Sequence, residues 1–393
     1  MSVDQPKQPF PGLVVISNSA SNASGNDVSG NSCCCGPSEP VQVIQHPLCA
    51  CQPWIAGTLE TSLRTVPLAK TKLQLRDILG GWKVRWGIGR MRYQIPPGLY
   101  AVGRPDRESP VLVSANYKLS FDCLRKELGG LNAWILVIDT KGINVWCAAG
   151  KGTFGTDEIV GRVNANRLHE IVSHRTLVVP QLGAPGVSAH RVKELCGFRV
   201  VYGPTRSKDL PAFLAAGMKA TPAMREVRFG LIDRIAVIPV ELEHWAKWAF
   251  LVAACLMILS GLERSGYSWN KVSSTGLLAG LVFLGTWLAG TVLSPILLPW
   301  LPGRAFSLKG LWLGLGLLAG LLAFCPMLRE NWWSTVGWGL LIPTTTSFVT
   351  MGFTGSSTYT SLSGVRHEMR RAVPLQLAGI VLGVGACLIS RFV

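Results

Sequence analysis

The chain has 393 residues and a formal net charge of +16, so it is long enough for two or three domains and basic enough to raise nucleic acid as a partner. Its Lys and Arg residues are spread without an aromatic-interleaved patch, and 28 of the 38 precede residue 245. This distribution disfavours a nucleic-acid-binding protein and favours the excess positive charge that membrane proteins carry on their cytoplasmic side.

Residues 1–56 are rich in Ser, Asn, Gly and Pro and predict a disordered leader. The first residues lack the basic and apolar regions of a secretory signal peptide, so we expect a reducing compartment with free thiols. Five cysteines lie in this leader: Cys33, Cys34, Cys35, Cys49 and Cys51. Their spacing does not match a zinc or iron–sulfur site, which leaves open a soft, linearly coordinated metal ion or a plain cysteine-bearing tail.

Residues 57–240 predict an α/β domain. Strand-like apolar runs alternate with helix-like stretches, which is typical of a Rossmann-like, mainly parallel sheet with crossover helices. The strands are expected at 111–114, 133–139, 176–179 and 198–202, and the helices at 118–128, 156–172, 187–196 and 207–217. Residues 82–100 mix Arg, aromatic residues and Gly, and predict a cap or short strands.

The segments that follow the strands are where a ligand of such a sheet would bind. Four of these segments, 114–120, 144–155, 181–186 and 202–206, are rich in Gly, Ala, Ser or Pro. Small residues let the backbone approach a ligand closely, so the composition favours a large, flat ligand, although ordinary turns share it.

Residues 241–393 predict a membrane domain of five helical spans, each near the roughly 20 apolar residues that cross a bilayer. The spans are expected at 245–262, 276–298, 308–327, 333–351 and 372–389. Gly310, Gly314, Gly316 and Gly320 predict close helix contacts in the third span. We expect a multi-pass protein of the cytoplasmic (inner) membrane, with the basic α/β domain in the cytoplasm and the C-terminus outside.

Three interpretations of the stretch 144–155 compete. Residues 150–155 match the GxGxxG pattern of nucleotide-binding loops, but the next predicted strand is not followed by the acidic residue that a dinucleotide needs. A nucleophilic Cys147 lacks a convincing base, because His169 and His174 lie at the far end of the next predicted helix. Cys147 could instead be an axial ligand of a metal cofactor, since its small neighbours would admit a planar macrocycle.

The run from Asn144 to Lys151, with its Trp146–Cys147 pair, resembles the cap-helix motif of the HgcA family, the corrinoid proteins of bacterial and archaeal mercury methylation. Segments 114–122, 181–187 and 202–209 resemble the corrinoid-binding domain shared with the corrinoid iron–sulfur protein of acetyl-CoA synthesis. A five-span tail is also HgcA-like. The resemblance covers about residues 60–393 and leaves the cysteine-bearing leader outside it.

The resemblance implies a cobalt corrinoid (cobalamin-like), bound base-off, with the Cys147 sulfur as the lower axial ligand. It implies methyl transfer from cobalt to inorganic Hg(II), giving methylmercury, and a thiolate opposite the methyl group would ease its departure toward this electrophile. The implied partners are an HgcB-type ferredoxin with two 4Fe–4S clusters, a methyl-tetrahydrofolate-linked methyl donor and the Hg(II) substrate.

The same resemblance assigns the site. The residues implied to surround the corrinoid are Ser114, Ser120, Asn144, Val145, Trp146, Cys147, Ala148, Ala149, Gly150, Lys151, Gly183, Ala184, Gly186, Tyr202 and Gly203. Trp146 could equally be a core aromatic residue, and Lys151 a solvated charge. The alternative function is a membrane-anchored nucleotide-binding or redox-sensing module with a reactive Cys147.

Overall fold

The computed structural model describes residues 52–329, 331–355 and 362–393. They form two compact units. One consists of the described part of Met1–Gly80 with Met91–Glu226, and the other combines Gly81–Arg90 with Val227–Val393. The leader cysteines Cys33, Cys34, Cys35, Cys49 and Cys51 lie outside the described residues.

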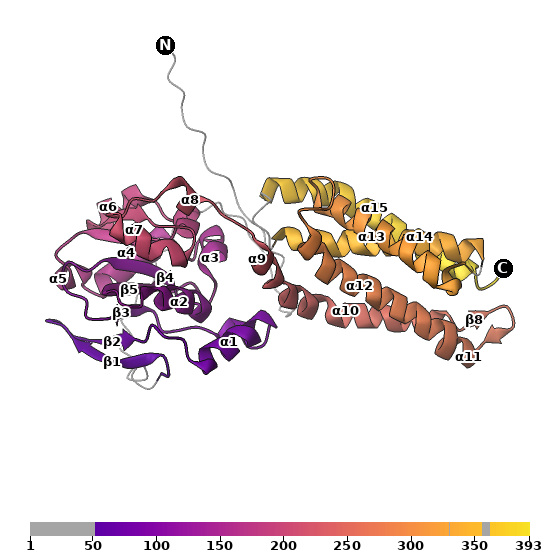
Figure 1. The fold of residues 1–393 in the computed structure, drawn as a ribbon, viewed down its shortest axis with the longest axis horizontal. Helices are drawn as coiled ribbons and strands as arrows, with labels where there is room; N and C mark the ends of the chain where they lie inside the picture. Colours follow the sequence, from indigo (N-terminus) through magenta and orange to yellow (C-terminus); the bar gives the residue numbers. More distant parts are fainter. Residues whose placement is uncertain (1–51, 330, 356–361) are drawn as a thin grey trace, which may run out of the picture. The chain divides into compact units, whose positions relative to one another are not determined.

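A seven-stranded mixed sheet runs through the first unit (Figure 1). Its strands are β1 (Ile55–Glu60), β2 (Thr65–Ala69), β3 (Gly98–Val102), β4 (Val111–Ala115), β5 (Ala133–Ile138), β6 (Thr176–Val179) and β7 (Arg199–Tyr202), in the spatial order β1-β2-β3-β5-β4-β6-β7. Strands β5, β4, β6 and β7 are parallel, whereas β3 pairs antiparallel with β5, and β1 with β2. The four predicted strands are confirmed, and the sheet is mainly parallel with an antiparallel edge.

Helices cover both faces of this sheet. They are α1 (Leu75–Arg85), α2 (Lys118–Arg125), α3 (Val145–Lys151), α4 (Thr156–Ala165), α5 (Leu168–Ile171), α6 (Ala189–Cys196), α7 (Leu210–Ala215) and α8 (Pro222–Arg225), with short 3-10 turns η2 (Arg90–Arg92), η3 (Lys126–Leu128), η4 (Gln181–Gly186) and η5 (Ser207–Asp209). Alternate residues of β5 point to opposite faces. Trp134 and Leu136 pack with α3 to α6, whereas Ile135 and Val137 pack with α2 and α7.

Two edges of the domain differ from the sequence prediction. Trp54 and Ile55, assigned to the leader, are buried. The Trp54 ring lies 5.4 Å from the Tyr100 ring and 5.2 Å from the Phe121 ring. Residues 82–100, expected as a cap or short strands, complete α1, form η2 and begin β3. Both errors arise because the partners that bury these segments are distant in sequence, so local composition does not reveal them.

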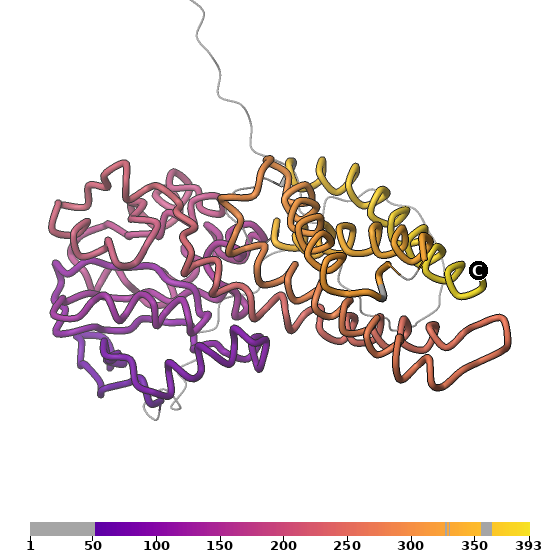
Figure 2. Tube along the Cα trace, turned by 45° about the vertical axis from the view of Figure 1, so that its right-hand side comes forward, coloured from indigo at the N-terminus to yellow at the C-terminus, as the bar shows by residue number. Residues whose placement is uncertain are grey.

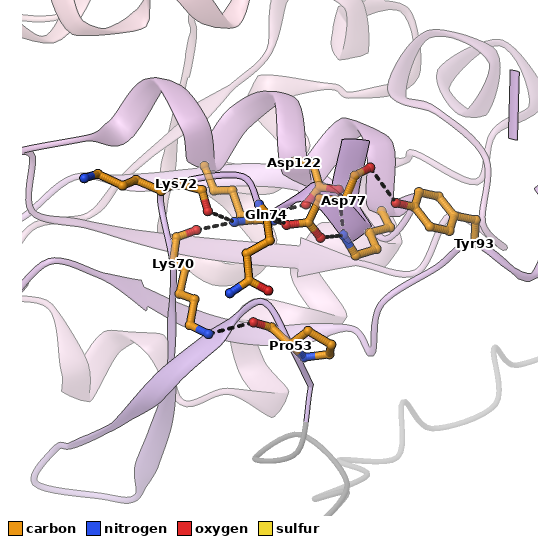
Figure 3. Close-up of polar contacts among 9 residues, drawn as sticks. Pro53, Lys70, Lys72, Gln74, Asp77, Tyr93 and Asp122 are labelled. Carbon is orange, nitrogen blue, oxygen red and sulfur yellow. Dashed lines mark hydrogen bonds and ion pairs between the residues drawn. The ribbon is translucent and has the colours of Figure 1, made fainter. Parts of the chain in front are cut away.

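A buried charge network joins α1 to α2 (Figure 3). Asp77 accepts from Lys118 Nζ at 2.6 Å and from Arg125 NH2 at 2.8 Å, and Asp122 accepts from the same two cations at 2.7 Å. The fully buried guanidinium of Arg125 also donates to the backbone carbonyl of Lys70. Each buried charge therefore has partners, as a low-dielectric interior requires.

The pKa values in this network move in opposite directions. Burial by itself would raise the pKa of Asp77, but hydrogen bonds from Lys118, the Gln74 N–H and Arg125 hold the pKa below its ordinary value. Burial would lower the pKa of Lys118, but its bonds to Asp122 and Asp77 raise that pKa. Both shifts favour the charged forms, so the network stabilises the fold across neutral pH.

The second unit is helical. Its long helices are α10 (Ile238–Leu259), α12 (Leu277–Leu297), α13 (Phe306–Phe324), α14 (Trp332–Gly352) and α15 (Leu362–Ile389), joined by α9 (Leu231–Ile235), α11 (Trp269–Lys271), the hairpin β8 (Leu262–Glu263) and β9 (Gly266–Tyr267), and the turns η6 (Val272–Gly276), η7 (Pro326–Arg329) and η8 (Phe353–Gly355). Figure 2 shows the long helices side by side. Among the described residues, four stretches are long and apolar enough to cross a membrane: Leu231–Leu259, Trp269–Leu297, Phe306–Phe324 and Gly364–Ile389.

Helix α14 coincides with the fourth predicted span, 333–351, but is not one of these four candidates. It is the most enclosed of the long helices. A Cβ atom on Gly314 of α13 would lie 2.5 Å from Pro343 Cα, and Gly310 approaches α14 similarly, whereas Gly316 and Gly320 have no described neighbour within 4 Å. The predicted close contacts are therefore confirmed at two of the four glycines. A fifth crossing and the sidedness of the membrane stay predictions.

The charge network makes a first testable prediction. Asp77→Asn should destabilise the α/β unit by about 3 kcal/mol, because Arg125 stays buried with one carboxylate fewer. Hydrogen exchange of α1 and α2 in the detergent-solubilised full chain measures this loss. The matched control is Lys126→Ala, which removes an exposed ion pair with Glu127 and should cost less than about 1 kcal/mol. Equal losses in the two variants would contradict the role of the network.

The same network predicts a pH dependence. The folded pKa of Asp77 is lowered, so its contribution is present above about pH 4 and is lost as pH falls through the folded value. The folded pKa of Lys118 is raised, so its contribution is present below about pH 10 and is lost as pH rises through the folded value. Thermal unfolding between pH 3 and 11 should show a plateau, with a smaller acid decline in Asp77→Asn.

Candidate functional site

The carboxyl ends of the four parallel strands lie at one edge of the sheet. The chain leaves β5 to form α3, which carries Cys147, and leaves β6 to form η4. Strand β4 lies between β5 and β6. This edge is where ligands bind in open α/β sheets, and it gathers most of the residues singled out in the sequence.

The side-chain amide of Asn116, directly after β4, fixes the turn that leads from β5 to α3. Its Oδ1 atom accepts from the N–H of Thr140 at 3.1 Å and from the N–H of Gly142 at 3.0 Å. Its Nδ2 atom donates to Asp139 Oδ1 at 3.0 Å and to Gln94 Oε1 at 3.3 Å. Asn116 is buried, so these bonds replace the water that its amide has lost.

Backbone geometry in this turn is unusual. Lys141 and Gly142 both have positive φ, at 57° and 70°, which is uncommon for lysine. Asp139 holds Lys141 in place by accepting from its backbone N–H at 2.9 Å and from Nζ at 2.8 Å. Burial would raise the pKa of Asp139, but these bonds lower it. Several hydrogen bonds therefore hold the turn in one conformation, and the turn fixes where α3 starts.

Helix α3 presents Cys147 on an exposed face. The Oδ1 atom of Asn144 caps the helix by accepting from the Cys147 N–H at 2.9 Å, and Gly152, with φ 81°, ends it. Ala148 and Ala149 form the buried side of the helix. The exposed residues of α3 are Trp146, Cys147, Gly150 and Lys151, and Val145 is half-buried. Trp146 is 38% exposed, so it is not the core aromatic residue of the structural alternative.

Turn η4 packs directly against α3. A Cβ atom on Gly186 would overlap the carbonyl oxygen of Phe154 and lie 3.1 Å from Ala149 Cα. A Cβ atom on Gly183 would lie 2.5 Å from the Phe154 ring. Gly186 is thus required for the close approach of η4 to α3, and Gly183 for the approach of η4 to Phe154, which follows that helix. Ala184, between them, is half-buried.

The remaining predicted residues have mainly structural contacts. Tyr202 donates from Oη to the Val187 carbonyl at 2.7 Å, and burial raises the pKa of Tyr202. Gly203 donates its N–H to the carbonyl of Val179 at 2.8 Å. Ser114 is buried inside β4, and half-buried Ser120 lies in the first turns of α2. The structure therefore brings together α3, η4 and the end of β7, whereas Ser114 is enclosed in the sheet.

The GxGxxG stretch 150–155 does not have the geometry of a dinucleotide fingerprint. That fingerprint needs a glycine turn directly between a strand and a helix. Here α3 intervenes after β5, Gly150 lies inside α3, and Gly155 is the N-cap of α4. This arrangement counts against the nucleotide-binding alternative.

Sequence reasoning missed two residues that position the site, Asn116 and Thr140. Both are buried, and the Thr140 hydroxyl lies 2.8 Å from Asn116 Oδ1 and 2.7 Å from the Ile143 carbonyl. A signal was present, because each polar residue follows the end of a buried strand by one or two positions.

Known proteins are similar to the part of the chain that contains this edge. A family model described as the CO dehydrogenase/acetyl-CoA synthase delta subunit matches residues 90–214, which include α3, η4 and β7. The chain is also similar to the gamma subunit of the acetyl-CoA decarbonylase/synthase complex from Methanopyrus kandleri, with 34% identity over 31% of this chain and 26% of that protein.

The chain is similar to the gamma subunits of two further organisms. Identity is 30% over 32% of this chain for Archaeoglobus fulgidus and 28% over 41% for Methanothermobacter thermautotrophicus. The chain spans 27% and 38% of the lengths of these two relatives. The residues matched by the family model, 90–214, hold the candidate site.

The exposed face of α3 has open space at Gly150. Among residues 52–329, 331–355 and 362–393, no cluster of three or more His, Cys, Asp or Glu side chains is placed to hold a metal ion. One exposed thiol suits a metal whose other ligands belong to its own cofactor. In the described part of the chain, nothing lies within 4 Å of the position of a Cβ atom on Gly150 or Gly152. A planar group can therefore lie close to this backbone.

The contact between η4 and α3 gives the next prediction. Gly186→Ala should destabilise the site by about 2 kcal/mol, because the added methyl group has no space against α3. The loss should appear as faster hydrogen exchange in α3 and η4 of the full chain. Gly150→Ala, on the open side of the same helix, is the control and should leave exchange unchanged or slower. Faster exchange in both variants would contradict the proposed packing.

Proposed function

We propose that this protein transfers a methyl group from a cobalt corrinoid to inorganic Hg(II), giving methylmercury, with the Cys147 thiolate as the lower axial ligand of a base-off, cobalamin-like cofactor. The observation that carries the proposal is the exposed Cys147 thiol on α3, at the carboxyl edge of a parallel sheet. This edge lies within the region similar to subunits of acetyl-CoA decarbonylase/synthase complexes.

The methyl-transfer reaction and the Hg(II) acceptor have different support. The similarity to acetyl-CoA decarbonylase/synthase subunits supports corrinoid methyl transfer in general. Hg(II) as the acceptor rests on the resemblance of the run from Asn144 to Lys151 to the HgcA cap helix. The Trp146–Cys147 pair is the specific part of that resemblance.

When bound, the cobalt corrinoid would supply the methyl-transfer chemistry, and the protein would supply a ligand, orientation and water exclusion. Cys147 offers a soft, strongly donating thiolate from a helix that Asn144 caps. Gly150 leaves room for a macrocycle beside that sulfur. The exposed Trp146 indole could cover the cofactor edge and exclude water, and Lys151 could face polar groups at its rim.

The same proposal assigns roles to the other predicted site residues and to partner proteins. Val145, Ala148 and Ala149 would support the cap from below, with Gly183, Ala184, Gly186, Tyr202 and Gly203 beside it and Ser114 and Ser120 at the neighbouring strand end. An HgcB-type ferredoxin would supply electrons, and a methyl-tetrahydrofolate-linked donor the methyl group. The protein would be a multi-pass protein of the cytoplasmic membrane, with the α/β domain in the cytoplasm.

Replacement of the thiol tests the proposal. Cys147→Ala should reduce mercury methylation to background, because the cobalt loses its axial sulfur. In the anaerobically purified protein loaded with cobalamin, the base-off spectrum should differ between the wild type and Cys147→Ala. Cys196→Ala is the matched control, since this half-buried thiol bonds the Val192 carbonyl in α6. Retained methylation, or coincident spectra, would refute the ligand role of Cys147.

Cobalt analysis separates the proposal from the redox-sensing or nucleotide-binding alternative. Full-length protein purified from a corrinoid-producing host should contain about one cobalt per chain under this proposal. A preparation with bound nucleotide and no cobalt would favour the alternative.

A further inference from the structure

Helix α1 exposes apolar side chains. The α1 apolar face consists of Leu75, Ile78, Leu79 and Trp82, with Trp86 and Ile88 just beyond the helix. Their exposed fractions run from 42% for Trp86 to 69% for Leu75. The spacing from Leu75 to Trp86 is that of one side of a helix. A continuous exposed apolar face of this kind marks a binding surface.

The opposite side of α1 is held in the protein interior. Asp77, Gly81 and Val84 are buried there, and Asp77 is tied to α2 by the charge network with Lys118 and Arg125. The helix is therefore fixed with its polar anchor inward and its apolar face outward. This is the reverse of the amphipathic pattern of an ordinary surface helix.

The charge around this face is strongly positive. Asp77 is the one acidic residue between positions 70 and 92, and its carboxylate is already paired with buried cations. The basic residues of the same stretch are Lys70, Lys72, Arg76, Lys83, Arg85, Arg90 and Arg92. An apolar face flanked by Lys and Arg and carrying two Trp residues is typical of helices that lie in a membrane interface.

The position of Gly81–Arg90 in the chain's helical unit also favours a membrane surface as the partner of α1. Gly81–Arg90 belongs to the compact unit that contains all four candidate membrane spans. A Cβ atom on Gly87 would lie 2.7 Å from Glu243 Oε2. Glu243 lies in the polar first part of α10, before its apolar run. Gly87 therefore lies beside the polar turns of α10 that precede its apolar run, where the headgroup region of a bilayer would be.

We propose that the α1 apolar face lies in the headgroup region of the bilayer and binds anionic phospholipid. Leu75, Ile78 and Leu79 enter the upper acyl region, and Trp82 and Trp86 lie at the headgroup level. The flanking Lys and Arg side chains contact lipid phosphates. The excess of positive charge favours an anionic lipid surface over an uncharged apolar partner protein.

The test uses the full chain in nanodiscs of phosphatidylcholine, with and without phosphatidylglycerol. Amide exchange in residues 75–92 should be roughly tenfold slower with the anionic lipid, since each basic side chain near such a surface adds to binding. The double variant Ile78→Asp/Leu79→Asp should abolish this difference. The matched control Leu195→Asp, at an exposed apolar residue of α6, should retain it.

A second variant separates lipid binding from misfolding. Lys83→Gln/Arg90→Gln keeps the apolar face and the Asp77 network, so exchange in α2 should match the wild type. The lipid-dependent slowing in residues 75–92 should fall several-fold. An unchanged difference between the two nanodiscs in this variant would overturn the role of anionic lipid.

Cross-linking identifies what covers the face. A photoreactive benzoylphenylalanine in place of Trp82 should form adducts with the mass of phospholipid in phosphatidylglycerol nanodiscs. Cross-links to protein alone, within the chain or to a second copy, would overturn the proposal. So would equal exchange of residues 75–92 in both nanodiscs. Neither readout depends on a corrinoid, so the outcome is independent of the proposed methyl transfer.

Discussion

The amide of Asn116 is the constraint on which the candidate site depends. A buried amide without partners is costly, and Asn116 obtains its partners from the turn between β5 and α3 and from Gln94. That turn has two consecutive residues at positive φ, a geometry that persists only where the surroundings enforce it. The amide thus converts the end of β4 into a support for the helix that carries Cys147.

A second contact that positions α3 is made by Gly186 of η4. Gly186 lets η4 approach Ala149 so closely that a methyl group would not fit. Asn116 directly follows β4, the strand beside β5, and Gly186 lies in the segment after β6, which is the next strand beyond β4. A seven-residue helix is too short to be stable alone, so its position comes from these two contacts. Rigid support of this kind is what a single ligand on a metal cofactor needs.

In the helical unit, buried polar side chains form hydrogen bonds to backbone carbonyls. Thr286 and Thr291 of α12 donate to the carbonyls of Val282 and Trp287, four residues earlier in the chain. In α14, Thr346 donates within its own helix. The Ser and Thr residues of α14 lower the mean hydropathy of that helix, although many of its residues are buried. Hydropathy alone therefore understates its place in the bundle.

Sequence by itself determined the order of units, the four parallel strands, four of the long apolar helices and the prominence of Cys147. These features depend on local periodicity and on residue type, which a sequence displays directly. The small-residue segments also identified η4, because close backbone approach requires glycine wherever it occurs.

Only the tertiary structure decided which residues meet. Trp54 and the start of β1 at Ile55 were assigned to the leader because the rings that bury Trp54 are distant in sequence. Asn116 and Thr140 looked like loop residues until β4 and β5 brought them together. Ser114 looked accessible but is enclosed in the sheet. In each case the deciding contact joins separate elements, and such contacts arise only when the chain has folded.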